Sequence, residues 1–218
     1  LMMISYCPYC TNYLFTFIYF IMPRRKTFKR KVKKTNVLRR VKRLERQREL
    51  KYIDETLSGT ATTTPLILQL SNIDRGTDDN SRIGNKVSVV GVQLRYYFVD
   101  DVVNWLRVMF VIDKQTNEAI YTSDELLADN TPSDNILSPL NRDNQGRFSV
   151  LYDKVHTLTT INEAGAVRRF FKLNLPIMYD GTGAGIADVT VNSLSLIMMC
   201  QASDVIIRAF VRVFYYDT

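Results

Sequence analysis

Short segments in which apolar and polar residues alternate make up most of the chain after residue 52. In each segment, β-branched and aromatic side chains recur at every second position, which is the period of a strand with one buried face. The pattern predicts seven strands, over residues 66–70, 86–99, 105–113, 147–160, 168–179, 193–201 and 205–216.

The same alternation assigns side chains to the two faces of a strand. In segment 86–99 it groups Val87, Val89, Gly91 and Gln93. In segment 147–160 it groups Phe148, Val150 and Tyr152, and it places His156 on the face of Tyr152 and Lys154. In segment 205–216 it sets Ile207, Ala209, Val211 and Val213 against Arg208, Phe210, Arg212 and Phe214.

Clusters of polar residues and glycine separate the predicted strands, at 74–84, 113–117, 129–134, 141–146 and 180–185. The threonine-rich segment 58–65 also has the composition of a turn. A short helix is expected at 122–128, capped by Thr122 or Ser123. Many short strands without βαβ alternation predict an all-β sandwich or barrel and argue against a Rossmann or P-loop fold. Gly181, Gly183 and Gly185 therefore belong to a loop between strands.

The 218 residues suit one domain with a tail, and the charge is divided unevenly along them. Residues 23–51 contain fifteen Lys and Arg against two Asp and Glu, a net charge of +13. Residues 52–218 contain fourteen against twenty, a net charge of −6. We therefore divide the chain into residues 1–21, a basic arm at 22–51 and a body at 52–218. An arm of this charge indicates a polyanionic partner.

The first half of the arm, residues 24–34, has too little apolar content to fold alone, whereas Val37, Val41 and Leu44 form one helical stripe. Neither glycines nor interleaved aromatic residues equip the arm for base recognition, so we expect sequence-independent packaging of nucleic acid, with a nuclear-import signal in 24–34. A solvated charge run and a calmodulin-like or anionic-membrane target are the alternatives. The residues expected to bind nucleic acid are Arg24, Arg25, Lys26, Lys29, Arg30, Lys31, Lys33, Lys34, Arg39, Arg40, Lys42, Arg43, Arg46 and Arg48.

Residues 1–21 are interpreted as an upstream extension outside the fold, because Met22 begins the basic run. The alternative is an interfacial anchor, since the apolar stretch 13–22 is too short to span a bilayer. Cys7 and Cys10 form a C-x-x-C pair without the second pair that a zinc site needs, so they are interpreted as incidental.

Catalytic residues are not evident in the sequence. His156 is the single histidine, and the acidic pairs Asp78–Asp79 and Asp100–Asp101 fall in predicted turns. A histidine on a strand is more often packed than catalytic. We therefore expect no enzyme, no cofactor, no metal site and no membrane partner.

The motifs of the body resemble capsid proteins of circular Rep-encoding single-stranded DNA (CRESS) viruses, whose single jelly-roll coats are similar to those of satellite tobacco necrosis virus and the geminiviruses. The distinctive blocks are IxxGTxDNxRIGxKV at Ile73–Val87 and SPxNxDNxxRFxVLYDxxHTL at Ser138–Leu158, the latter shorter by one residue. Further matching segments lie at 51–64, 68–98, 106–115, 169–181 and 211–218.

This resemblance implies an eight-stranded antiparallel jelly roll that assembles with copies of itself into a small icosahedral shell, of T=1 size, around a single-stranded DNA genome. It also implies a virion protein that enters the host nucleus through the host import machinery by means of its arm. Arg95, Arg107, Arg168 and Arg169 are candidates for the inner face of the shell. The alternative function is a nucleic-acid-binding β-sandwich protein that does not assemble.

Overall fold

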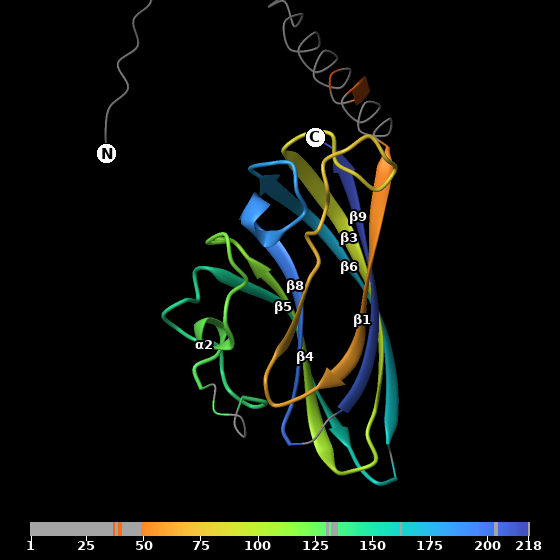
Figure 1. Cartoon of the computed structure of the whole chain (residues 1–218), viewed down its shortest axis with the longest axis vertical. Coiled ribbons are helices and arrows are strands. Elements are labelled where there is room, and N and C mark those ends of the chain that lie inside the picture. The colour runs from red at the N-terminus through yellow and green to blue at the C-terminus, as the bar shows by residue number, and fades with distance from the viewer. Residues whose placement is uncertain are drawn as a thin grey trace, which may run out of the picture. The chain divides into compact units, whose positions relative to one another are not determined.

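The computed structural model describes residues 37, 39–40, 49–129, 131, 135–161, 163–202 and 205–217. The chain divides into two units, Leu1–Gln47 and Arg48–Thr218. The second unit is a sandwich of two antiparallel sheets (Figure 1).

One sheet has the strand order β1-β9-β3-β6-β7 and the other has the order β2-β8-β4-β5. The strands are β1 (Leu50–Ala61), β2 (Leu66–Gln69), β3 (Lys86–Val99), β4 (Asn104–Asp113), β5 (Phe148–Leu158), β6 (Ala164–Tyr179), β7 (Val189–Val191), β8 (Ser193–Cys200) and β9 (Val205–Asp217). A short helix, α2 (Ser123–Leu126), and a 3₁₀ turn, η1 (Ile186–Asp188), lie in the connections.

This topology is a jelly roll, and it confirms the predicted fold. Without the three-residue β7, the sheets have four strands each, in the orders β1-β9-β3-β6 and β2-β8-β4-β5. Every connection between consecutive strands crosses from one sheet to the other, except those from β4 to β5 and from β6 to β7. Such a double-sheet roll is one way in which antiparallel proteins limit their exposed edges.

The two sheets differ in how their outer faces are covered. The main core lies between them, and a second apolar cluster lies beyond the four-stranded sheet, where Met109, Val111 and Ile197 pack against residues of the α2 segment, among them Leu126. All eight residues of β8 are therefore buried, whereas β9 alternates between buried and exposed positions along most of its length. In Figure 1 no described segment of the body covers the outer face of the five-stranded sheet.

Strand β1 departs from the sequence analysis in two ways. It begins at Leu50, inside the range assigned to the arm, and it continues to Ala61, so half of the segment expected to be a turn, 58–65, is strand. Lys51 is buried: its ammonium donates to the carbonyl of Ser81 at 2.8 Å and lies 3.1 Å from Asp217 Oδ2. Lys51 therefore belongs to the structure of the body and anchors β1.

Two bulges correct the predicted faces. The register of β3 shifts between Val89 and Gly91, so Gln93 lies on the outer face while Val92 and Leu94 join the core. The register of β5 shifts beside Phe110 and Val111, so Val150 packs in the second cluster while Tyr152 packs against the main core. A bulge reverses every later side chain of a strand. The predicted faces of β9 are confirmed.

The loops that close one end of the body are tied together by Arg82, which is fully buried. Its Nε donates to the carbonyl of Ile73 at 2.9 Å, Nη1 to that of Gly84 at 2.8 Å and Nη2 to that of Gly181 at 2.9 Å. Its guanidinium also stacks 4.2 Å from the ring centroid of Tyr179. The glycine-rich segment is thus a loop between strands, as predicted, and α2 confirms the short helix, with Thr122 as its N-cap.

Candidate nucleic-acid interface

The described part of the arm is small. Val37, Arg39 and Arg40 are helical and exposed, in agreement with the helix proposed for the second half of the arm. The other twelve arm residues expected to bind nucleic acid lie outside the described residues, as do Cys7 and Cys10.

The body carries a further group of basic side chains, on the open face of the five-stranded sheet. Arg95 on β3 lies directly opposite Arg168 on β6, and Arg208 on β9 lies opposite Tyr97, two residues further along β3. All three arginines are exposed. Within the described part of the chain, none of the three has a carboxylate within salt-bridge distance. We refer to Arg95, Arg168 and Arg208 as the arginine group.

Aromatic rings lie among these arginines. Phe210 is the β9 partner of Arg95 and is 55% exposed. Phe170 on β6 is 61% exposed, and the centroid of its ring lies 6.2 Å from that of Phe214. A Cβ atom at position 91 would come within 2.7 Å of the Phe170 ring, so the glycine at this position leaves room for the ring. Exposed rings of this size are the exception on a solvated sheet face, because each keeps apolar area in contact with water.

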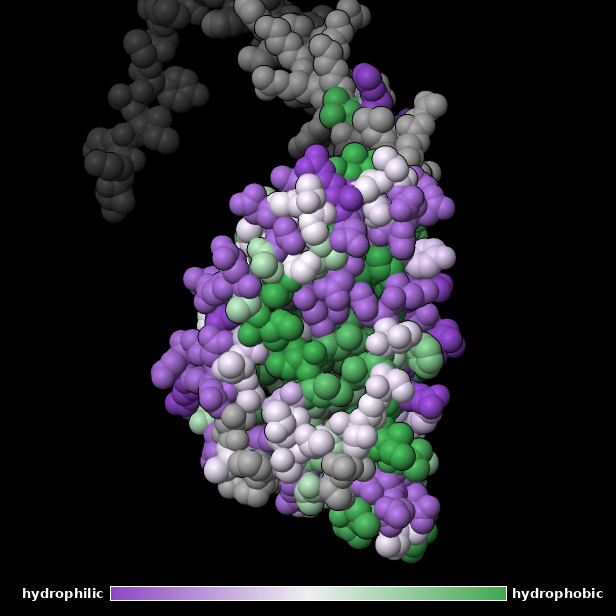
Figure 2. Space-filling view, in the orientation of Figure 1, coloured by the Kyte–Doolittle hydropathy of each residue, from purple (hydrophilic) through white to green (hydrophobic). Residues whose placement is uncertain are grey.

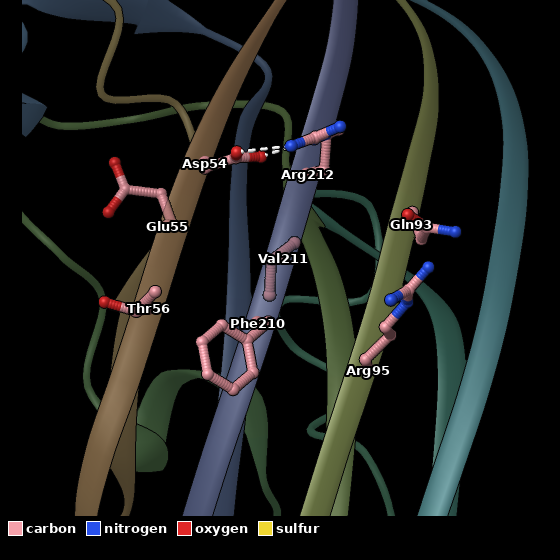
Figure 3. A pocket seen from close by; sticks show the side chains of 8 residues that line it. All are labelled: Asp54, Glu55, Thr56, Gln93, Arg95, Phe210, Val211 and Arg212. Carbon is pink, nitrogen blue, oxygen red and sulfur yellow. Dashed lines mark hydrogen bonds and ion pairs between the residues drawn. The ribbon is translucent and has the colours of Figure 1, made fainter.

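Two hollows on this face share Arg95 and Phe210. One, of about 310 Å³, is lined by the arginine group, Tyr97, Phe210 and Ala166 among others. The other, of about 480 Å³, extends toward β1 (Figure 3). There Arg212 is bound to Asp54, with both nitrogen–oxygen distances at 2.6 Å, and this contact lowers the pKa of Asp54. Figure 3 shows Arg212 turned toward β1, whereas Arg95 lies on the opposite side of β9.

The four body arginines named from the sequence do not form one surface. Arg107 is buried: it donates to both carboxylate oxygens of Asp153, at 2.9 and 2.6 Å, and to the carbonyls of Asn135 and Ser138. Arg169 lies opposite Leu94, on the core side of β6. Arg107 and the exposed Arg169 therefore do not share a sheet face with Arg95 and Arg168, and the assignment of the four arginines to the inner face of a shell stays a prediction. The sequence did contain a signal for the β9 residues of this face, because alternation places Arg208, Phe210 and Arg212 on one side of the strand.

His156 is part of a hydrogen-bonded cluster at the edge of the main core. Its Nε2 lies 2.7 Å from the hydroxyl of Tyr96, which lies 3.0 Å from the hydroxyl of Tyr152. The ring of Phe98 packs 4.7 Å from the imidazole. Burial, together with nearby Lys154, lowers the pKa of His156. The predicted shared face of His156 and Tyr152 is confirmed.

Exposed apolar side chains gather at one end of the body. The β3–β4 and β5–β6 loops meet there, through a hydrogen bond from the Asp100 amide to the Glu163 carbonyl at 2.9 Å. Val103 is 65% exposed and Ile161 is 96% exposed in these two loops. Val99, Val102 and Ile206 also expose much of their surface at this end. Figure 2 shows that other apolar surface lies near the middle of the side where β1 is seen, between hydrophilic regions.

The described residues contain no cluster of three His, Cys, Asp or Glu side chains placed to hold a metal ion. No helix in this part of the chain is long and apolar enough to cross a membrane.

No protein-family model matches the chain, and no curated protein matches it. Among solved structures, the chain is similar to one from Desmodium yellow mottle tymovirus, with a TM-score of 0.33 and 8% identity, over 77% of this chain and 88% of that chain. It is also similar to a chain of the T13 IBDV viral particle, with a TM-score of 0.16 and 12% identity, over 77% of this chain and 39% of that chain. Both structures are of viruses, but likenesses this low carry no argument about function, which rests on the residues of this chain.

Proposed function

We propose that this protein is a viral coat protein that assembles with copies of itself into a small icosahedral shell of T=1 size and packages single-stranded DNA through its basic arm. One observation carries the proposal: residues 23–49, of net charge +12, directly precede the jelly-roll body that begins with β1 at Leu50 and has a net charge of −5. The resemblance of the body motifs to CRESS-virus capsid proteins supports the same function.

The charge division suits a closed shell. Each Lys or Arg that neutralises a phosphate releases counterions, so an arm of net charge +12 repeated in every subunit binds a single-stranded genome strongly and without sequence preference. Without such a partner, the arms of neighbouring subunits would repel one another. The acidic body adds no further positive charge to the shell.

The apolar end of the body supports self-assembly. Val103, Ile161 and their neighbours expose apolar surface at the end where two loops meet. Contiguous exposed apolar patches commonly mark protein–protein contacts, because burial of that area stabilises association. We assign this end to the contact between subunits.

Negative-stain electron microscopy of the recombinant chain, purified without nuclease, tests the proposal. We expect uniform small spherical particles that contain DNA. Val103→Glu places a charge in the apolar end and should prevent particle formation. Leu137→Glu, at a position 68% exposed elsewhere on the body, is the matched control and should leave particles intact.

A soluble monomer at low salt, with and without added single-stranded DNA, would overturn the coat function. It would leave a nucleic-acid-binding β-sandwich that does not assemble. The arm would then act without a shell.

We also propose that the arm contains a nuclear-import signal within residues 24–34, whether or not the protein assembles. A fluorescent fusion protein tests this signal: it should enter nuclei when the segment is intact and should not enter them when the basic residues of the segment are replaced by Gln.

We also propose that the protein is not an enzyme and that His156 has a structural role. Its imidazole is held by the hydroxyl of Tyr96 and the ring of Phe98, which leaves it little freedom to reach a substrate. Particle formation by a His156→Gln variant would agree with this role.

A further inference from the structure

The arginine group lacks the acidic partner that three other arginines of the body have. Arg107, Arg147 and Arg212 are each paired with a carboxylate. Arg95 and Arg168 instead lie directly opposite each other across β3 and β6. Like charges at opposite positions destabilise a sheet. An anion that binds between them would remove this repulsion.

The rings beside the arginine group add a second kind of contact. Phe210 and Tyr97 line the same 310 Å³ hollow as the three guanidinium groups, and the short side chain of Ala166 leaves it open. Cations alternating with exposed rings are the equipment of proteins that bind single strands, in which bases stack on aromatic side chains while phosphates meet the cations.

We propose that the open face of the five-stranded sheet is a second binding site for single-stranded DNA, apart from the arm. Phosphates are bound by Arg95, Arg168 and Arg208, and a base stacks on Phe210 in the hollow. The inference rests on the proposed function, in which single-stranded DNA is the packaged ligand. It gives the body, and not only the arm, a direct contact with the packaged strand.

The charges of this face favour DNA over a second copy of the chain. Four cations and two carboxylates line the two hollows: Arg95, Arg168, Arg208, Arg212, Asp54 and Glu55. Two such faces would repel each other. Duplex DNA is disfavoured as well, because its bases are already stacked and paired and cannot reach Phe210.

Photocrosslinking of the full chain tests the contact directly. The probe is an oligothymidylate that carries 5-iodouracil, which crosslinks to aromatic side chains beside it. Mass spectrometry should find crosslinked peptides that contain Tyr97 or Phe210, and the same sequence presented as a duplex should give none. Phe210→Ala should remove the β9 crosslink while the arm still binds the oligonucleotide.

Salt titrations of the affinity measure the phosphate contacts. The triple variant Arg95→Gln, Arg168→Gln, Arg208→Gln should lower the slope of log affinity against log salt by about 2, because each contact with a single strand contributes about 0.7. The control is a triple variant at exposed cations elsewhere on the body: Lys114→Gln, Arg142→Gln, Lys154→Gln. It changes the net charge by the same amount, and its slope should stay close to that of the wild type.

Substitutions at Phe210 measure the stacking. At high salt, where the contacts of the arm are screened, Phe210→Leu should weaken binding about tenfold, whereas Phe210→Trp should preserve it. A purely structural role for the ring would make these two variants differ in thermal stability and not in affinity.

The outcomes separate this proposal from the coat function. Particles that form normally, with no body crosslinks and with equal slopes in the two triple variants, would overturn the sheet-face site and leave the coat function intact. Crosslinks at Phe210 in a chain that forms no particles would support the site and overturn the coat function.

Discussion

Replacement of Arg82 by lysine tests whether one buried guanidinium holds the loops at one end of the body together. Three different nitrogens of Arg82 donate to the carbonyls of Ile73, Gly84 and Gly181, and Nη2 also lies 3.2 Å from the carbonyl of Gly183. A lysine keeps the charge but has a single nitrogen, so it can occupy only one of these three positions.

The magnitude follows from the bonds lost. Hydrogen bonds to charged groups contribute about 1.5–3 kcal/mol each, so the loss of two lowers the free energy of unfolding by at least about 3 kcal/mol. For a domain of this size, that corresponds to a fall in Tm of about 6–12 °C. Burial also lowers the pKa of Arg82, and the cost of burying the charge remains with lysine.

The assay is thermal unfolding followed by circular dichroism, with all variants at one protein concentration because assembly raises the apparent Tm. Arg75→Lys is the matched control: Arg75 is in the same loop but exposed, and its Nε makes a 3.2 Å bond to the carbonyl of Ile83. We expect a change within about 0.5 kcal/mol there. If Arg82→Lys lowers Tm no more than Arg75→Lys does, the reasoning about the buried guanidinium is refuted.

Three further predictions concern the body. The pKa of His156 is lowered in the folded state, so the unfolded chain binds more protons than the folded chain once the pH falls toward the usual histidine pKa. When the pH is lowered from about 7.5 to about 5.5, the Tm of the wild type should therefore fall further than the Tm of His156→Gln. Equal decreases of Tm in the two thermal melts would contradict this. Gly165→Ala places a methyl group against the buried ring of Phe98 and should cost about 1–3 kcal/mol in urea unfolding, whereas Gly146→Ala, in open space, should cost little. Arg147→Met leaves the buried carboxylate of Asp113 without its partner and should lower the free energy of unfolding by about 3–5 kcal/mol. A double-mutant cycle with Asp113→Asn should show strong coupling between the two residues, and additive effects of the two substitutions would argue against the ion pair.

The fold could be predicted from the sequence because most strands are recognisable from their own pattern of apolar and polar residues. Strands with apolar runs or clean alternation, such as β8 and β9, were predicted within a residue or two of their ends. Strand β1 was not, because Ile53, Leu57 and Ala61 are its only apolar residues that face the core and its remaining residues are mostly polar. It is an edge strand held by pairing with β9 over twelve residue pairs, a tertiary effect that no local pattern reveals.

The candidate site was accessible only in part. Arg95 and Arg168 were named from the sequence. Arg107 was named with them because alternation within one strand does not show which strands share a sheet. Arg169 was also named, although it follows Arg168 on one strand and alternation therefore directs it to the opposite face. The bulge at Val89–Gly91 also moved Gln93 to the open face, and a run of valines gives no sign of such a shift. The contribution of Arg208 and Phe210 became clear only when β9 was placed between β1 and β3.

The unequal covering of the two sheets has a consequence for how this protein can change in evolution. In β8 every position is buried, so a substitution there alters packing whichever way the side chain points. In β9 every second position faces outward and can vary without a cavity or a clash in the core. Selection can therefore adjust the ligand preference of the open face one residue at a time while the covered sheet preserves the fold.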